Sequence, residues 1–433
     1  MLRKILVTTG LILLWALAVV GVVFAEASWF GHPAVERGNL VSIENHLTQN
    51  LQDAVENKRL GSAGLVLVQN GKIVAERGFG VSNAETQAPV KTSETLFQLA
   101  SLSKAVTAFG IMKLVEEGKI NLDEPVMRYL KRWRFAGSDA NFRDKVTVRY
   151  LLSHTAGLND GAAFGVILPG EKMQTLEESL NLASDSGALK LIIEPGTGMV
   201  YGNGNYAVLQ LLLEDVTGRT FADYMKETVL QPLGMSKSSF DLNSIEQNLA
   251  PNFDASLNPQ PTRRFTAMGA VSLYATPQDL ARFSFAFTAE NPVLKQETIK
   301  QMLTPQPATA GTWGLGQTLF VETDAGNYVA GHDGGSLPAW GAMMRVNPAT
   351  GNAMVLMVSG GSGGVNQLPH DWVYWETGKM TYDAKRQVFY DRMKGFGLVA
   401  FIFGAVAIVL WKAFGDKFRI RRLMKVILTF SSV

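Results

Sequence analysis

The sequence predicts an α+β fold in which helices flank an antiparallel sheet and a mostly helical lobe is inserted between its strands. Strand-like segments occur early, over 64–80, and again late, over 327–358. Residues 120–320 between them are rich in helical and turn patterns. A sheet built from both ends of a domain leaves the middle as a lobe, and we expect a site where the two meet.

The early elements are a helix, a hairpin, and a strand that leads into a second helix. Apolar residues recur at helical spacing over 42–60. In GLVLVQNGKIVAERGFG, Asn70-Gly71 fits a type I′ turn between two strands. LFQLA then predicts a strand over 96–100, and the apolar sequence after it predicts a helix over 102–118.

The late elements are short strands followed by a helix. The predicted strands cover 327–330, 340–346 and 353–358. The turn Asn347-Pro348-Ala349-Thr350-Gly351 separates the last two strands. A helix is predicted near 366–378.

The N-terminal segment is predicted to direct the chain to a membrane. After MLRK, the 21 residues Ile5–Ala25 carry no charge, which is long enough to span a bilayer. Ala25-Glu26-Ala27 offers the small-x-small pattern of a cleavage site. Residues 1–27 therefore form either a cleaved signal peptide or a retained signal anchor, and the sequence leaves both open.

The C-terminal segment predicts a membrane tether. Residues 395–411 are 17 uncharged residues, the short limit for a spanning helix, and a buried core helix is the alternative. Trp411 at the end and six basic residues after it favour a transmembrane helix whose basic tail, 412–433, is cytoplasmic. Residues 379–394 then form a juxtamembrane linker. We expect the domain before it to lie on the outer side of a bacterial cytoplasmic membrane.

Charge and composition exclude several classes of function. Eight of the 40 basic residues lie in 1–4 and 412–433 with one of the 38 acids, so the rest of the chain has 32 basic and 37 acidic residues. A mildly acidic domain is not expected to bind nucleic acid, which needs a clustered basic surface. The chain has no cysteine and no cluster at metal-ligand spacing, so we expect neither a metal nor a cofactor.

Ser101-Leu-Ser-Lys104 is the only Ser-x-x-Lys in the chain. Residues three apart on a helix share a face, which puts the lysine amine within reach of the serine hydroxyl. A serine hydroxyl needs an adjacent base to become a nucleophile, and a lysine whose pKa is lowered by burial and by the helix N-terminus can serve. A capping serine beside a surface lysine is the alternative that these four residues leave open.

Two further segments carry candidate site residues. Tyr201-Gly-Asn203 follows a Pro-Gly turn, and its phenol could act as a general base while its carboxamide holds a substrate or the lysine. Gly331-His332-Asp333-Gly334-Gly335 precedes a predicted strand, where glycines permit close approach of a ligand to backbone N–H groups. A Ser-His-Asp triad is disfavoured, because adjacent strand residues point to opposite faces.

Taken together, these segments resemble the serine β-lactamase and penicillin-binding protein family, in its class C-like branch, which also holds DD-peptidases and esterases. The Ser-x-x-Lys signature is one of its marks. The supporting segments occur in family order: LFQLASLSK, VTVRYLLSHTAGL, EPGTGMVYGNGNY, LQPLGM, AMGAVSLYATPQDLARF, WGLGQ and GHDGGS. The resemblance covers roughly residues 40–360, and we place a β-lactamase/transpeptidase-like serine hydrolase domain over 28–378.

The resemblance also implies roles for these residues. Ser101 would be the acylated nucleophile, Lys104 its proton-handling partner and Tyr201 the general base. Asn203 would orient Lys104 and the substrate, and the backbone N–H groups of Ser101 and Gly335 would form the oxyanion hole. His332 and Gly334 stand where class C enzymes have Lys-Thr-Gly, so a substrate carboxylate would be held weakly and efficient β-lactam hydrolysis is not expected.

We therefore expect a membrane-tethered serine hydrolase that forms an acyl-enzyme on a small-molecule or peptide ester or amide, as an esterase or a D-amino-acid or cell-wall peptidase. A weak β-lactamase and a non-catalytic penicillin-binding sensor module are the alternatives. Substrate turnover that is lost in Ser101→Ala separates an enzyme from a sensor.

Overall fold

The computed structural model describes residues 35–135, 140–159, 165–168, 170–182, 188–245, 248–254, 256–336, 340–361, 365–386, 390 and 404. Val35–Thr381 forms one compact unit, which is the unit described below. The predicted segments 1–27, 395–411 and 412–433 lie outside the described residues, apart from Gly404. Among the residues that are described, no helix is both long and apolar enough to cross a membrane.

The described residues form a six-stranded antiparallel sheet in the order β2-β1-β12-β11-β10-β9, which confirms the predicted α+β fold. Its strands are β1 Ser62–Gln69, β2 Lys72–Gly80, β9 Thr318–Glu322, β10 Tyr328–Ser336, β11 Trp340–Asn347 and β12 Asn352–Ser359. Strands from the two ends of the unit meet where β1 pairs with β12. Asn70 and Gly71 have φ of 52° and 72°, so the predicted type I′ turn is confirmed.

The sheet separates two apolar cores. Alternation along β1 places Leu65 and Leu67 in one core and Val66 and Val68 in the other. The first core lies under α2 Leu40–Glu56 and α12 Leu368–Thr377. The second lies under α3 Ser103–Glu116 and α10 Pro277–Phe285 and continues into the lobe.

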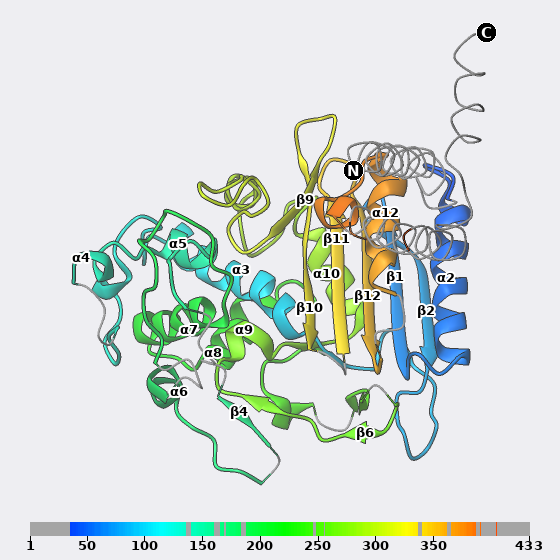
Figure 1. Cartoon of the computed structure of the whole chain (residues 1–433), viewed down its shortest axis with the longest axis horizontal. Coiled ribbons are helices and arrows are strands. Elements are labelled where there is room, and N and C mark those ends of the chain that lie inside the picture. Colours follow the sequence, from blue (N-terminus) through cyan, green and yellow to red (C-terminus); the bar gives the residue numbers. More distant parts are fainter. Residues whose placement is uncertain are drawn as a thin grey trace, which may run out of the picture. The chain divides into compact units, whose positions relative to one another are not determined.

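The inserted lobe is mostly helical, as predicted, and α3 runs from the sheet into it (Figure 1). Its α-helices are α4 Ala140–Arg143, α5 Val148–Leu152, α6 Leu176–Leu182, α7 Asn203–Thr217, α8 Phe221–Met225, α9 Met268–Val271 and α11 Gln296–Met302. Short strands pair as β3 Phe97–Gln98 with β8 Tyr274–Ala275, β4 Val166–Ile167 with β7 Arg264–Phe265, and β5 Asn252–Phe253 with β6 Pro259–Gln260. Single 3-10 turns occur at Ala100–Leu102, Val126–Arg128, Leu242–Ser244 and Val365–Gln367, and a π turn at Lys226–Leu230.

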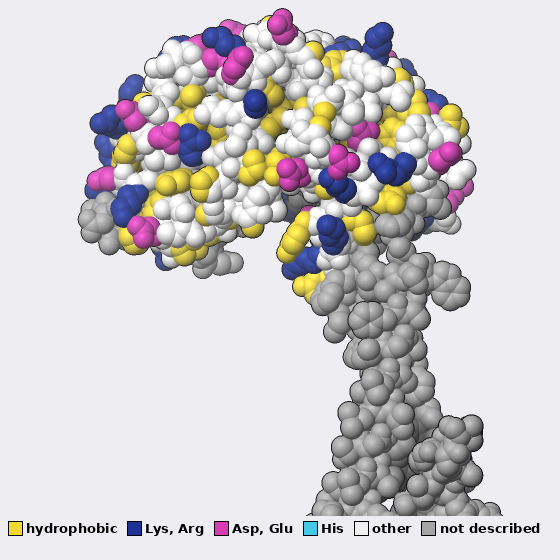
Figure 2. Space-filling view, turned by 90° about the horizontal axis from the view of Figure 1, so that it is seen from above, with side chains coloured by type: hydrophobic (Ala, Val, Ile, Leu, Met, Phe, Trp, Pro, Cys, Tyr) yellow, Lys and Arg dark blue, Asp and Glu magenta, His cyan; other side chains and the backbone are white. Residues whose placement is uncertain are grey.

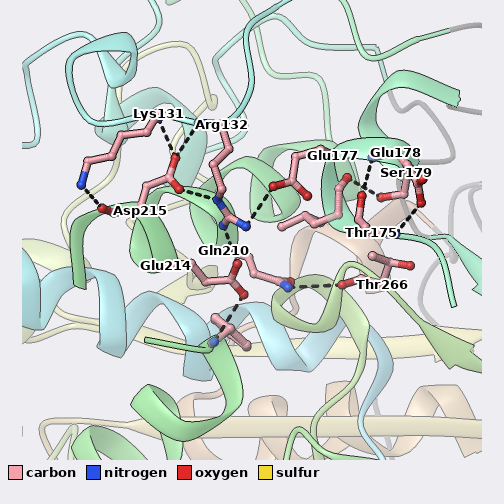
Figure 3. Close-up of polar contacts among 12 residues, drawn as sticks. Lys131, Arg132, Thr175, Glu177, Glu178, Ser179, Gln210, Glu214, Asp215 and Thr266 are labelled. Carbon is pink, nitrogen blue, oxygen red and sulfur yellow. Dashed lines mark hydrogen bonds and ion pairs between the residues drawn. The ribbon is translucent and has the colours of Figure 1, made fainter. Parts of the chain in front are cut away.

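Ion pairs hold the C-terminal end of α7 in the lobe (Figure 3). Arg132 contacts Glu177, Glu214 and Asp215 at 2.9, 2.6 and 2.6 Å. One turn earlier in α7, the Gln210 amide donates to the Thr266 carbonyl at 3.2 Å and accepts from the Gly269 N–H at 3.0 Å (Figure 3 shows the first contact). The helix that begins at Asn203 is therefore fixed against both α6 and α9.

Two sequence predictions about local structure were wrong, and one strand was missed. The strand expected over 96–100 is limited to Phe97–Gln98, because the chain turns at Ala100. The segment 331–335 was expected to precede a strand but lies inside β10. Glycines are unfavourable inside a strand unless another backbone approaches closely, and here they sit where β10 packs against neighbouring backbone. The edge strand β9 was not predicted, because a five-residue edge strand carries little periodic signal.

Charges of both signs are interspersed on the face shown in Figure 2. Lysine and arginine side chains there alternate with aspartate and glutamate, and no basic area covers that face. This surface matches the mildly acidic balance of the chain outside its two ends.

Candidate active site

Ser101 lies in the 3-10 turn Ala100–Leu102, directly before α3. The residue before it, Ala100, has a φ of 45°, a conformation that non-glycine residues seldom adopt. Such strain persists only where the surroundings enforce it, and it clusters at active sites. Here the Leu99 N–H is held by the Leu273 carbonyl at 2.8 Å. The turn presents Ser101 at the N-terminal end of a 14-residue helix, where the helix dipole favours negative charge.

Lys104 is completely buried, so the reading of this lysine as a surface cation is excluded. Its Nζ lies 3.0 Å from Ser101 Oγ, 2.7 Å from Asn203 Oδ1 and 3.0 Å from the Ala270 carbonyl oxygen. Burial penalises an ammonium, which favours the neutral amine. In that form the 3.0 Å contact lets the Ser101 hydroxyl donate its proton to Nζ.

Tyr201 and Asn203 approach Lys104 from the start of α7. Asn203 is the first residue of the helix, and its carboxamide accepts from Lys104. The Tyr201 ring centroid is 5.1 Å from Lys104 Nζ, and the residue as a whole is 39% exposed. The structure thus brings together the serine, the lysine, the tyrosine and the asparagine that sequence analysis singled out.

β10 passes against the turn that carries Ser101. A Cβ added at Gly334 would lie 1.9 Å from the Leu99 carbonyl oxygen and 2.7 Å from the Leu102 nitrogen. Only glycine permits this approach, which places the predicted oxyanion residue Gly335 next to the turn. Gly335 pairs with Gly341 on β11.

We predict that Gly334→Ala separates β10 from the Ser101 turn. The added methyl would overlap backbone atoms of Leu99 and Leu102, so either the strand or the turn must shift. Activity should fall by about 100-fold, because a displacement of about 1 Å at an active site costs that much. Steady-state kinetics measure the loss. The control is Gly326→Ala, which strains a backbone with a φ of 76° but meets no neighbouring atom, so it shows what local strain alone does to activity. Full activity in Gly334→Ala would contradict the proposed oxyanion geometry.

His332 is buried beside this cluster and is held in one tautomer. Its Nδ1 is 2.6 Å from the Asp333 carbonyl oxygen, so Nδ1 carries the proton and Nε2 is a lone-pair acceptor. The Asp333 side chain points elsewhere and pairs with the buried Arg345, with an Nη2–Oδ2 distance of 2.9 Å. The structure therefore agrees with the rejection of a Ser-His-Asp triad.

Burial lowers the pKa of His332 to about 4, and Lys104 adds to this effect. Burial likewise holds the pKa of a second histidine, His154, well below its ordinary value, with smaller effects from Lys104 and His332. Both imidazoles are neutral at pH 7. The site therefore contains no fixed cation at His332.

These two histidines predict acid lability. Unfolded histidine titrates near pH 6.5, so below that pH the unfolded chain binds protons that the folded chain excludes. Stability contributed by neutral His332 is complete above about pH 6.5 and decreases toward pH 4, by about 3 kcal/mol. Urea unfolding of wild type and His332→Gln from pH 7.5 to 4.5 measures it. The variant should lose less stability on acidification, and equal losses in both proteins would contradict the prediction.

Sequence analysis assigned no role to three residues that the structure places here. Ala270 supplies a backbone acceptor for Lys104. Trp313 packs edge-on against His154 and His332, with ring centroids 5.1 and 5.3 Å apart. His154 itself lies 4.4 Å from the Tyr201 ring. The apolar neighbours of His154 in LLSHTAGL signalled its burial, but not its partner.

A family model described as Beta-lactamase matches residues 47–379, which include every residue of this cluster. The chain belongs to the β-lactamase family. The resemblance inferred from the motifs is therefore confirmed, and so is the superfamily of serine hydrolases to which it points. The match does not distinguish a class C specificity from the others in this family.

Curated relatives in the β-lactamase family have differing names. Esterase EstB from Burkholderia gladioli is 27% identical over 77% of this chain and 95% of its own length. Penicillin-binding protein 4* from Bacillus subtilis is 30% identical over 44% of this chain. The alignment spans 40% of the length of that protein.

Solved structures of similar fold cover the same unit. The D-amino acid amidase from Ochrobactrum anthropi has a TM-score of 0.62 at 23% identity, over 77% of this chain and 98% of its own. EstCE1, described as a hydrolase with promiscuous acyltransferase activity, has a TM-score of 0.63 at 22% identity over the same shares. At these identities the likeness establishes the fold alone.

Proposed function

We propose that this chain is a serine hydrolase that forms an acyl-enzyme at Ser101 on an ester or amide substrate. The observation that carries the proposal is the 3.0 Å contact between Ser101 Oγ and the fully buried Nζ of Lys104. A buried amine beside a hydroxyl at a helix N-terminus is an arrangement suited to proton transfer from an attacking serine.

In the proposed acylation, Ser101 Oγ attacks the substrate carbonyl as its proton moves to Lys104. The negative charge on the carbonyl oxygen is stabilised by the backbone N–H groups of Ser101 and Gly335. The C–O or C–N bond then breaks, and the leaving group takes a proton through Tyr201. Water attacks the acyl-enzyme in the second half, gives up its proton to the same groups, and releases the acid with Ser101 restored.

An esterase or a D-amino-acid or cell-wall peptidase is the substrate class we favour. Relatives named as an esterase and a D-amino acid amidase support it. A neutral His332 also supports it, because a β-lactam or peptide carboxylate is best held by a fixed cation. Weak β-lactam hydrolysis, or acylation by penicillin without turnover, is the alternative.

A substrate panel tests the proposal. The wild-type chain and Ser101→Ala are assayed on p-nitrophenyl esters, D-amino-acid amides and β-lactams. We expect turnover of an ester or amide that is lost in Ser101→Ala, with β-lactams hydrolysed far more slowly. Equal rates in the two proteins would overturn the proposal, and a penicillin adduct on Ser101 without any turnover would favour the sensor module.

We also propose that residues 395–411 tether the domain to the outer side of a bacterial cytoplasmic membrane, with the basic tail 412–433 inside. The support is the uncharged run followed by six basic residues. Carbonate extraction of membranes that contain the full chain tests it. To remove any contribution of an N-terminal anchor, residues 1–27 are exchanged for a cleaved signal peptide. That chain should stay in the pellet, and release should follow a stop codon introduced after residue 394. Extraction of the full chain would contradict the tether.

A further inference from the structure

His154 is a completely buried histidine next to Tyr201 that the proposed chemistry does not use. Its backbone has a φ of 59°, a left-handed conformation that non-glycine residues adopt at a cost. It follows α5, and its N–H donates to the Leu151 carbonyl at 3.3 Å. Backbone strain of this kind clusters at functional sites, so the contacts of the His154 side chain are of interest.

His154 contacts three consecutive residues of the segment that leads into α7. Its carbonyl oxygen accepts from the Val200 N–H at 2.8 Å. Its ring lies 4.4 Å from the Tyr201 ring. Its Nδ1 accepts from the Gly202 N–H at 3.4 Å. One residue therefore fixes the backbone on both sides of Tyr201 and the tyrosine ring itself.

These contacts require the neutral ring. Since Nδ1 accepts from Gly202, the proton of the neutral imidazole is on Nε2. The groups that face the ring are Tyr201, Tyr206, Trp313, and, through electrostatics, Lys104 and His332. A second proton on Nδ1 would break the Gly202 contact and add a buried cation near Lys104.

The same segment sets the geometry at Lys104 on two sides. Tyr201 precedes Gly202, and Asn203, whose carboxamide is 2.7 Å from Lys104 Nζ, follows it. A shift of Gly202 would move the tyrosine ring and the asparagine together. The contacts of His154 thus act on Tyr201 and Asn203, two of the residues that lie around Lys104.

We propose that His154 is a positioning residue that holds Tyr201 and the first turn of α7 in register with Lys104 and Ser101. This inference rests on the function proposed above. It predicts that a substitution of His154 lowers the rate by displacing Tyr201. The effects of substituting His154 and Tyr201 are therefore not additive.

Two variants of His154 separate its contacts. His154→Asn keeps an acceptor that can reach the Gly202 N–H and suits a φ of 59°, but removes the ring contact. His154→Phe keeps an aromatic ring against Tyr201 but removes the acceptor. The matched control is His46→Asn on α2, at a histidine that pairs with Asp371 under the other face of the sheet.

The test is a double-mutant cycle on the wild-type background of the full chain, using the best ester from the panel. Each His154 variant should lower kcat by about 10- to 100-fold with KM changed less than about twofold. In a Tyr201→Phe background, His154→Asn should lower kcat no further. His46→Asn should leave kcat unchanged.

The outcomes separate three cases. Additive losses of kcat in His154→Asn and Tyr201→Phe would overturn the inference, as would unchanged kcat in either folded single variant. If His154→Asn does not fold, His154→Phe is combined with Tyr201→Phe instead, and the loss of kcat should then be less than additive, because the Gly202 contact also positions Tyr201. Equal activity of wild type and Ser101→Ala would instead overturn the proposed function. In that case the substitutions of His154 and Tyr201 would not affect the rate either, so the two failures can be told apart.

Discussion

Replacing Ser101 by alanine should reduce kcat/KM by about 10⁴-fold or more while leaving the fold intact. The hydroxyl is the proposed nucleophile, so its loss removes the covalent route altogether. Stability should change little, because one contact of Lys104 is lost and its contacts with Asn203 and Ala270 remain. Steady-state kinetics together with urea unfolding measure the two effects.

The control for this prediction is Ser82→Ala. Ser82 is a half-buried serine whose hydroxyl donates to the Ala88 carbonyl, outside the site residues. It should keep wild-type activity. Retention of more than about a tenth of the wild-type rate in Ser101→Ala would contradict the proposed nucleophile.

Replacing Lys104 by methionine should lower kcat by about 10³- to 10⁴-fold, and the protein should remain folded. Methionine fills the volume of the buried side chain without its amine. The fold loses the donor to Asn203 and Ala270, which costs about 1–3 kcal/mol. That loss is smaller than the about 5–15 kcal/mol by which a typical folded domain is stable.

Stability and activity should therefore separate in Lys104→Met. The control is Lys113→Met on the same helix, at a lysine whose side chain is 24% exposed and faces Glu116 at 3.8 Å. Lys113→Met should keep its rate. An active Lys104→Met would contradict the role of the amine, and an unfolded one is separated from an inactive one by its circular dichroism.

Sequence patterns predicted those structural features that are determined by residues close together in the chain. Asn70-Gly71 specifies its own turn, because both residues tolerate positive φ. Ser101 and Lys104 were identified as a pair, and their side chains do meet. The pair forms across a 3-10 turn and the start of α3, rather than within a regular helix.

Contacts between distant segments were beyond prediction from local patterns. The turn at Ala100 lies against β10 at Gly334, more than two hundred residues later in the chain. In the same way, the roles of His154 and Ala270 depend on residues that lie beside them only in the folded chain. His154 packs against Tyr201, and Ala270 accepts a hydrogen bond from Lys104. A lone histidine or alanine carries no periodic signal of such a partner.

The central claim is that Ser101 is the nucleophile, and covalent labelling tests it most directly. The full chain is treated with a fluorophosphonate, and the adduct is located by peptide mass spectrometry, with Ser101→Ala and Lys104→Met treated in parallel. We predict one adduct, on Ser101, which is absent from Ser101→Ala and forms much more slowly in Lys104→Met. An active preparation that takes up no label on Ser101, or takes it up on another residue, would contradict the account.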